Sequence, residues 1–276
     1  MKQKRVEQVL MSMPTSDGAG VNLRRAIGRA GLRNVDPFLM LDEIRSDDPK
    51  DYIAGFPPHP HKGFETLSYM LKGSMAHKDS TGGEGLITSG GVQYMTAGKG
   101  IIHSETPKQE SGMLWGFQLW INLPAKDKFQ DAKYVDIPKD QIPELDLTEH
   151  TKAKLIAGKF HQAVGPVKRD DIGFFMADVT SRETDHQNFE FDNDTRGFVY
   201  VYKGHADVNG QQVPAQSIAQ LGAGERVEIA SQKDTGYLLL AATPIDEPIV
   251  QYGPFVMNTQ AEIDQAVSDY QNGRFA

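Results

Sequence analysis

Two short stretches of the chain each place two potential metal ligands two residues apart. His59-Pro60-His61 carries two imidazoles, and His103-Ser104-Glu105 carries an imidazole and a carboxylate at the same spacing. In an extended strand, residues i and i+2 lie on the same face. If both stretches are strands that face into one barrel, they present three nitrogen atoms and one carboxylate oxygen. Such a set suits Fe, Mn, Ni, Cu or Zn, and it leaves coordination positions for water or substrate.

Each pair taken alone has a simpler explanation, because a single His-x-His or His-x-Glu is usually an accident of a surface strand or loop. Two such pairs, each beside a glycine-rich turn, make a metal site the better interpretation. Pro57, Pro58 and Pro60 support it, because proline fixes φ and biases the preceding residue toward extended backbone.

The rest of the chain predicts the barrel that these strands require. Glycine and proline interrupt it throughout, and short runs rich in β-branched and aromatic residues lie between them, as in 65–71 and 197–202. Strands of this length with turn residues at both ends are typical of sandwiches and barrels. Helical periodicity is weak until residues 261–270, where we expect one short amphipathic helix with Thr259 as its N-cap.

The two halves of the chain resemble each other. Residues 69–73 (YMLKG) match 200–204 (YVYKG), and a second pair of turns recurs at an offset of 126 residues instead of 131. We therefore predict two β-barrel domains, residues 1–140 and 141–276, with a linker near 136–151. The same offsets place Glu190 and Asp192 at the positions of the first histidine pair, and Ile229 and Ser231 at those of His103 and Glu105. Since none is an imidazole, the second domain is expected to bind no comparable metal.

Composition excludes several classes of protein. The 276 residues include 37 Asp and Glu against 29 Lys and Arg, a formal net charge of −8, and no cysteine. The acidic balance argues against direct nucleic-acid binding, which needs a cationic surface. Without cysteine there is no disulfide, no iron–sulfur cluster and no thiolate nucleophile. Neither a secretory apolar run nor a membrane span of about 18 apolar residues is found, so we expect a cytoplasmic protein.

Several segments resemble the pirins, a family of the cupin superfamily. Residues 55–66 (GFPPHPHKGFET) and 95–105 (MTAGKGIIHSE) are similar to the two pirin signatures. Further similar segments are 23–28 (LRRAIG), 36–43 (DPFLMLDE), 252–259 (YGPFVMNT) and 269–273 (DYQNG). The resemblance runs nearly end to end and is weakest through roughly 130–195. It implies an all-β chain of two cupin (jelly-roll β-barrel) domains in tandem, the N-terminal one binding metal, with a short C-terminal helix.

The resemblance also implies a metal and its ligands. Carried over residue by residue, the pirin ligands are His59, His61, His103 and Glu105. One divalent transition metal per chain is expected, iron(II) first, with Ni, Mn, Cu or Zn as alternatives. Glu65 follows the first histidine pair by four residues, where many other cupins have a metal ligand. Here it is either a carboxylate that orients a ligand imidazole or a structural one.

Several pirins open the ring of the flavonol quercetin with O2 and release carbon monoxide, so the resemblance implies a quercetin 2,3-dioxygenase-type oxidoreductase. A carboxylate would accept the proton of the flavonol 3-hydroxyl, with Glu105 and Glu65 as the candidate catalytic bases. A flat polyphenol needs an apolar slot, although ordinary core packing also accounts for most of the apolar side chains near the signatures: Phe56, Phe64, Met95, Trp115, Phe117 and Trp120.

The alternative is a non-catalytic, metal- and redox-sensing protein that regulates a protein partner. Its surface would be the basic cluster of Arg24, Arg25, Arg29 and Arg33, which could equally be a solvated loop. An open apolar cavity that reaches the metal would favour catalysis, and a filled barrel would favour regulation. A third possibility, an isomerase of the cupin type, fits the signatures less well.

Overall fold

The computed structural model describes residues 1–109 and 111–275, and it is built almost entirely of antiparallel strands. Two compact units can be distinguished, and each is formed from separate pieces of the chain. One consists of residues 14–33, 38–139 and 245–276, and we call it the histidine barrel because it contains both ligand motifs. The other consists of residues 1–13, 34–37 and 140–244, and we call it the second barrel. The predicted all-β class with one short C-terminal helix is confirmed.

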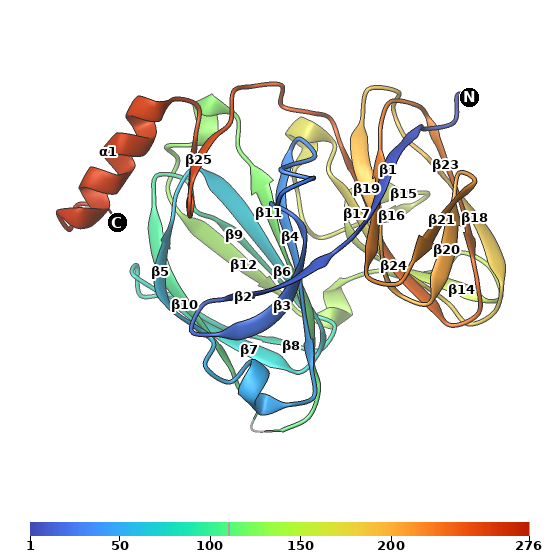
Figure 1. Ribbon diagram of the computed structural model, residues 1–276, viewed down its shortest axis with the longest axis horizontal. Helices are drawn as coiled ribbons and strands as arrows, with labels where there is room; N and C mark the ends of the chain where they lie inside the picture. Colours follow the sequence, from blue (N-terminus) through green and yellow to red (C-terminus); the bar gives the residue numbers. More distant parts are fainter. Residues whose placement is uncertain (110, 276) are drawn as a thin grey trace. The chain divides into compact units, whose positions relative to one another are not determined.

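The histidine barrel is made of two sheets and a C-terminal segment (Figure 1). The larger sheet has the order β12 (Lys133–Ile137), β9 (Val92–Thr96), β6 (Phe64–Lys72), β11 (Leu114–Asn122), β4 (Phe38–Ser46), β3 (Val21–Ile27), β2 (Met13–Asp17). The smaller sheet has the order β5 (Phe56–His61), β10 (Ile101–Pro107), β7 (Ser74–Asp79), β8 (Glu84–Thr88). The C-terminal segment contains the hairpin β25 (Val250–Tyr252) and β26 (Phe255–Met257), followed by helix α1 (Gln260–Gln271).

The second barrel repeats this plan. Its larger sheet has the order β1 (Val6–Met11), β22 (Ser217–Leu221), β19 (Arg196–Lys203), β24 (Thr235–Ala242), β17 (Phe175–Ser181), β14 (Thr151–Ala157), β13 (Glu144–Asp146). Its smaller sheet has the order β18 (Asp185–Glu190), β23 (Arg226–Ser231), β20 (His205–Val208), β21 (Gln211–Pro214), and a short hairpin joins β15 (Lys159–Phe160) to β16 (Ala163–Val164). Four 3-10 turns complete the secondary structure: Pro49–Asp51, Ala125–Asp127, Lys139–Gln141 and Asp170–Ile172.

The matching strand orders explain the internal sequence repeat. Strand β6, with the first YMLKG motif, and β19, with its counterpart, are each the third strand of a seven-stranded sheet. The outermost strand beside β9 is β12, but the outermost strand beside β22 is β1, from the start of the chain. The main change of unit comes between residues 139 and 140. The second barrel also takes in residues 1–13 and 34–37, and the histidine barrel takes in residues 245–276. Sequence repeats alone cannot reveal such an exchange, because the exchanged strands lie outside the repeated motifs.

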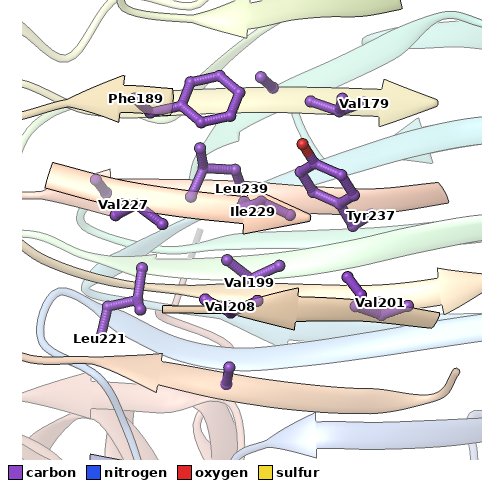
Figure 2. Close-up of a cluster of buried hydrophobic side chains, with 14 of the residues drawn as sticks. Val179, Phe189, Val199, Val201, Val208, Leu221, Val227, Ile229, Tyr237 and Leu239 are labelled. Carbon is purple, nitrogen blue, oxygen red and sulfur yellow. The ribbon is translucent and has the colours of Figure 1, made fainter. Parts of the chain in front are cut away.

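In the second barrel a glutamine and apolar residues lie where the histidine barrel carries imidazoles. Opposite Ile229 on β23 lies Gln187, and opposite Val227 lies Phe189. The predicted equivalents Glu190 and Asp192 are therefore wrong by a register shift, and Gln187 and Phe189 occupy the positions of His59 and His61. Phe189, Val227 and Ile229 belong to one core cluster, and Figure 2 shows their side chains among those of neighbouring strands.

Helix α1 begins as the sequence predicts. Thr259 accepts a hydrogen bond from the backbone of Glu262, and the Glu262 side chain accepts one from the backbone of Thr259, which forms a capping box. Ile263 and Ala266 face a small core with Phe255, Met257 and Phe275. Among the described residues, no helix combines the length and the apolar composition that crossing a bilayer requires.

A buried lysine ties the C-terminal segment to the turn that follows the histidine pair. The Lys128 ammonium donates to the carbonyl oxygens of Gly63 (2.7 Å) and Val256 (3.0 Å) and to Oδ1 of Asn122 (2.7 Å). Gly63 has φ of +85°, and a Cβ there would lie 2.0 Å from the carbonyl oxygen of Val256, so only glycine fits. Burial lowers the pKa of Lys128 to about 8, which leaves it protonated at neutral pH with all three N–H groups bonded.

Replacing Lys128 with methionine should therefore weaken the histidine barrel. The change keeps an apolar stem but removes the donor from buried oxygen acceptors, so we expect the free energy of unfolding to fall by about 2–4 kcal/mol. Chemical denaturation measures this loss. Lys126→Met, at an exposed position two residues away, is the matched control and should change stability by less than about 0.5 kcal/mol. Equal stability of the two variants would contradict the role of Lys128.

Candidate metal centre

The two ligand motifs lie on neighbouring antiparallel strands, as the spacing required. Strands β5 and β10 lie side by side (Figure 1), and in their pairing His59 is opposite His103 and His61 is opposite Ile101. Strand β5 is at the edge of its sheet, which explains how it accommodates three prolines. Proline has no N–H to donate to a neighbouring strand and is therefore tolerated at a sheet edge. The pairing therefore places His59, His61 and His103 on one side of the two-stranded ladder.

The three imidazoles form a group that could hold a metal ion. Their ligand atoms all lie within 4.8 Å of one another. The ring centroids are 4.7 Å apart for His59 and His61, 4.5 Å for His59 and His103, and 4.8 Å for His61 and His103. Nε2 of His59 lies 2.9 Å from Nε2 of His61. Three nitrogen atoms converging at this range are typical of a transition-metal site.

The protonation states also fit a metal. Burial is the main cause that lowers the pKa of His61 well below its ordinary value, and it lowers the pKa of His103 to about 4. Both rings are therefore neutral at pH 7, which is the form that binds metals. Nδ1 of His59 lies 2.9 Å from the carbonyl oxygen of Pro57. A proton donated there leaves the lone pair on Nε2, on the side of the other two rings.

Two buried nitrogens of this group lack a protein partner. Within the described part of the chain, neither Nδ1 of His61 nor Nε2 of His103 has a hydrogen bond, although both atoms are fully buried. A buried polar atom without a partner costs free energy, so such atoms usually indicate an unseen ligand or water. The imidazole group therefore has the donor set that a bound cation would require, with His61 and His103 neutral and Nε2 of His103 unused.

Glu105 lies beside this group but is not part of it. It is buried on β10, and a register shift separates it from His103 in the pairing with β5. Its carboxylate accepts hydrogen bonds from Nε2 of Gln118 (2.9 Å) and the Ser68 hydroxyl (3.4 Å). It also lines a small void of about 20 Å³, large enough for one water molecule.

Glu65 has a different environment. It is buried on β6, and its carboxylate accepts hydrogen bonds from the hydroxyls of Tyr94 (2.5 Å) and Thr96 (2.8 Å), both on β9. These bonds connect two neighbouring strands of the larger sheet. Phe64, the preceding residue, packs edge-to-face against His61 with centroids 5.1 Å apart. Glu65 thus fixes the strand that supports one of the imidazoles.

An open cavity of about 510 Å³ reaches the imidazole group within the histidine barrel. His59 and His61 form part of its wall, and Phe56 and Trp120 are among its aromatic residues. The Trp120 ring meets His61 edge-to-face at 5.3 Å. Of the six apolar candidates near the signatures, these two line the cavity. Trp115 instead donates to Glu43, and Phe117 stacks on Tyr69.

Family models match two parts of the chain. One described as "Pirin" matches residues 20–121, and one described as "Pirin C-terminal cupin domain" matches residues 176–276. The chain belongs to the pirin family. The predicted resemblance is thereby confirmed, and the two barrels are cupin-type domains.

Relatives and solved structures agree with this assignment. A Pseudomonas aeruginosa protein named "Putative quercetin 2,3-dioxygenase" is 44% identical over 270 residues, covering 95% of each chain. A pirin-like protein of Caulobacter vibrioides is 42% identical over 276 residues, covering 100% of each chain. The crystal structure of a quercetin 2,3-dioxygenase from Acinetobacter baumannii superimposes with a TM-score of 0.93 at 32% identity, covering 99% of each chain.

Sequence reasoning missed a row of polar side chains inside this pirin barrel. Five residues on neighbouring strands of the larger sheet are successive cross-strand partners and therefore share its inward face. They are Arg25, Asp42, Gln118, Ser68 and Gln93. A polar residue in the middle of an apolar strand, such as Gln118 in the run from Leu114, was the available signal. The alignment of the five became evident only with the strand register.

Removing one imidazole tests the metal group. His103→Ala deletes one of three converging nitrogen atoms, so we expect metal content to fall from about one per chain to well below 0.2 after dialysis. Elemental analysis of the purified protein measures this ratio. His186→Ala, an exposed histidine on β18, is the control and should retain the metal. A His103→Ala variant that keeps one metal per chain would contradict the site.

Proposed function

We propose that this protein is a metal-dependent dioxygenase that opens the ring of a flavonol such as quercetin with O2 and releases carbon monoxide. The open cavity that reaches the imidazole group carries the proposal, because a small molecule can approach His59 and His61 directly. Its volume lies within the roughly 300–1,000 Å³ of pockets that take drug-sized ligands. The relatives named as quercetin 2,3-dioxygenases support the same reaction.

His59, His61 and His103 would hold the metal, iron(II), with Glu105 as a fourth ligand that leaves the metal when it acts as the base. When bound, it supplies Lewis-acid and redox chemistry toward the flavonol and O2. Glu105 is a buried carboxylate on the same strand as His103, two residues after it on β10. Ser68 and Gln118 hold its carboxylate in place from the opposite sheet.

The chain's own residues bind and orient the substrate. Phe56, Trp120 and Met40 give the cavity apolar walls that suit a flat aromatic molecule and exclude water from it. Glu105 accepts the proton of the flavonol 3-hydroxyl, and Gln118 stabilises the carboxylate before that transfer. Glu65, whose two oxygens are both bonded to hydroxyls on β9, acts by holding the barrel wall behind His61.

The cavity also favours catalysis over the regulatory alternative. A filled barrel beside an ordered basic surface would have suited a protein that presents its metal to a partner. Arg25 lines the cavity and is bound by two carboxylates, whereas Arg24 lies on the other face of β3. The four arginines of the basic cluster therefore do not form one continuous surface.

Carbon monoxide release from quercetin tests the reaction. Protein reconstituted with iron(II) should release carbon monoxide in the presence of O2, and His61→Ala should abolish release because the cavity-lining imidazole is lost. Gas chromatography or haemoglobin binding measures the product. His186→Ala should behave as the wild type. If protein that carries one metal per chain releases none, the proposed reaction is wrong.

The same assay separates the two buried carboxylates. Glu105→Gln keeps the shape but cannot accept a proton, so we expect turnover to fall by about 10²–10⁴-fold. Glu65→Gln keeps an acceptor for one hydroxyl and should reduce turnover by less than about tenfold. An equal loss in both variants would contradict the assignment of Glu105 as the base.

A further inference from the structure

The cavity has a second polar site, on the sheet opposite the histidine strand. Arg25 on β3 makes a two-pronged ion pair with Asp42 on β4, Nε to Oδ1 at 2.8 Å and Nη2 to Oδ2 at 2.7 Å. The same Nη2 donates to Oδ2 of Asp17, at the end of β2, at 2.8 Å. All three residues line the cavity that reaches His59 and His61. We call Asp17, Arg25 and Asp42 the carboxylate–arginine triad.

The triad is held rigidly at its inner end and open to solvent at its outer end. The Asp42 side chain is only 4% exposed, that of Arg25 is 23% exposed and that of Asp17 is 53% exposed. Burial raises the pKa of Asp42 to about 6, opposed by the guanidinium, so the carboxylate is ionised at pH 7. A paired guanidinium with a buried anchor keeps its orientation, which is what ligand recognition requires.

The charges of the triad select the kind of ligand. One guanidinium and two carboxylates sum to a net charge of −1, which disfavours a carboxylate or phosphate group in this part of the cavity. Within the described residues, the hydrogen bonds of the Arg25 guanidinium use Nε and Nη2, and Nη1 has no acceptor. The triad therefore offers carboxylate acceptors and one donor. A phenolic hydroxyl, which both donates and accepts, matches this combination.

The same cavity also has apolar walls. Leu23, Ile44 and Met40 extend from the same sheet as the triad, and Phe56 lies on the histidine strand. An aromatic ligand that reaches the imidazoles with one oxygen would lie along this wall and present its remaining hydroxyls to the sheet that carries the triad. Nothing in the imidazole group itself would distinguish a flavonol with ring hydroxyls from one without them.

We propose that the carboxylate–arginine triad determines specificity by binding the phenolic hydroxyls of a neutral, polyhydroxylated aromatic substrate. This inference rests on the proposed function for the other end of the ligand, the part that reaches the metal. Asp17 accepts from a phenolic hydroxyl, and Nη1 of Arg25 donates to the neighbouring oxygen. The triad does not take part in the reaction with O2, so its effect is on binding.

Equilibrium binding to metal-loaded protein under anaerobic conditions tests the triad without turnover. The two probes are quercetin and 3-hydroxyflavone, which shares the 3-hydroxy-4-keto group but lacks the other hydroxyls. Wild-type protein should bind quercetin about tenfold or more tightly, because hydrogen bonds to charged groups discriminate strongly. Asp17→Asn and Arg25→Gln should each reduce the ratio of the two affinities, quercetin over 3-hydroxyflavone, by at least about fivefold, mainly because quercetin binds more weakly.

The control is Asp47→Asn, an exposed position on the same barrel that makes the same change of charge away from the cavity. It should keep the wild-type ratio. Arg25→Gln leaves Asp42 buried without its partner and can destabilise the barrel, so Asp17→Asn, at a half-exposed position, provides the independent measurement. A wild-type ratio near one, or a ratio unchanged in Asp17→Asn, overturns the inference.

Failure of the inference can be distinguished from failure of the proposed function. If the protein releases carbon monoxide and the ratio is unchanged in Asp17→Asn, the reaction stands and the triad has no role in specificity. If no carbon monoxide is released but the ratio falls in Asp17→Asn and not in Asp47→Asn, recognition by the triad stands and the reaction is wrong.

Discussion

The convergence of three imidazoles on one point, two of them buried, is the constraint on which the rest of the histidine barrel depends. Charging any two of them would bring like charges within a few ångströms in a region of low dielectric, and burial accordingly lowers the pKa of His61 and His103. Leaving them neutral without partners costs the hydrogen bonds of two buried nitrogens. A cation bound between the three rings suits their uncharged form and gives Nε2 of His103 a partner, and the strands around them are arranged to keep that geometry.

Support for the imidazoles comes from parts of the chain that are distant in sequence. The prolines keep β5 extended, Phe64 and Trp120 pack against His61, and Lys128 joins the following turn to the C-terminal hairpin. Gly63 permits that hairpin to approach because it carries no Cβ. The exchange of terminal segments thus has a functional consequence, because residues beyond 245 complete the barrel that holds the histidines.

The sequence was sufficient for features that depend on local spacing. Two ligand pairs at i and i+2, together with prolines, predicted the strands that carry His59, His61 and His103, and Thr259 predicted the start of α1.

Features that depend on register were not accessible from the sequence. The offsets between the halves placed Glu190 and Asp192 where the structure has Gln187 and Phe189, because loop lengths differ between the copies. The polar row that begins at Arg25 is spread from residue 25 to residue 118 and becomes continuous only when five strands align. Likewise, alternating apolar residues fill the second barrel but line an open cavity in the histidine barrel. The alternating sequence pattern is the same in both cases, so it does not reveal which barrel is open.

X-ray absorption spectroscopy of the iron(II)-reconstituted protein tests the central claim most directly. Multiple scattering from imidazole rings counts the histidine ligands independently of any reaction. We expect three imidazoles with the remaining ligands oxygen, and the loss of one imidazole in His59→Ala. A metal environment with one imidazole or none in the wild-type protein would show that the three converging histidines do not bind the metal.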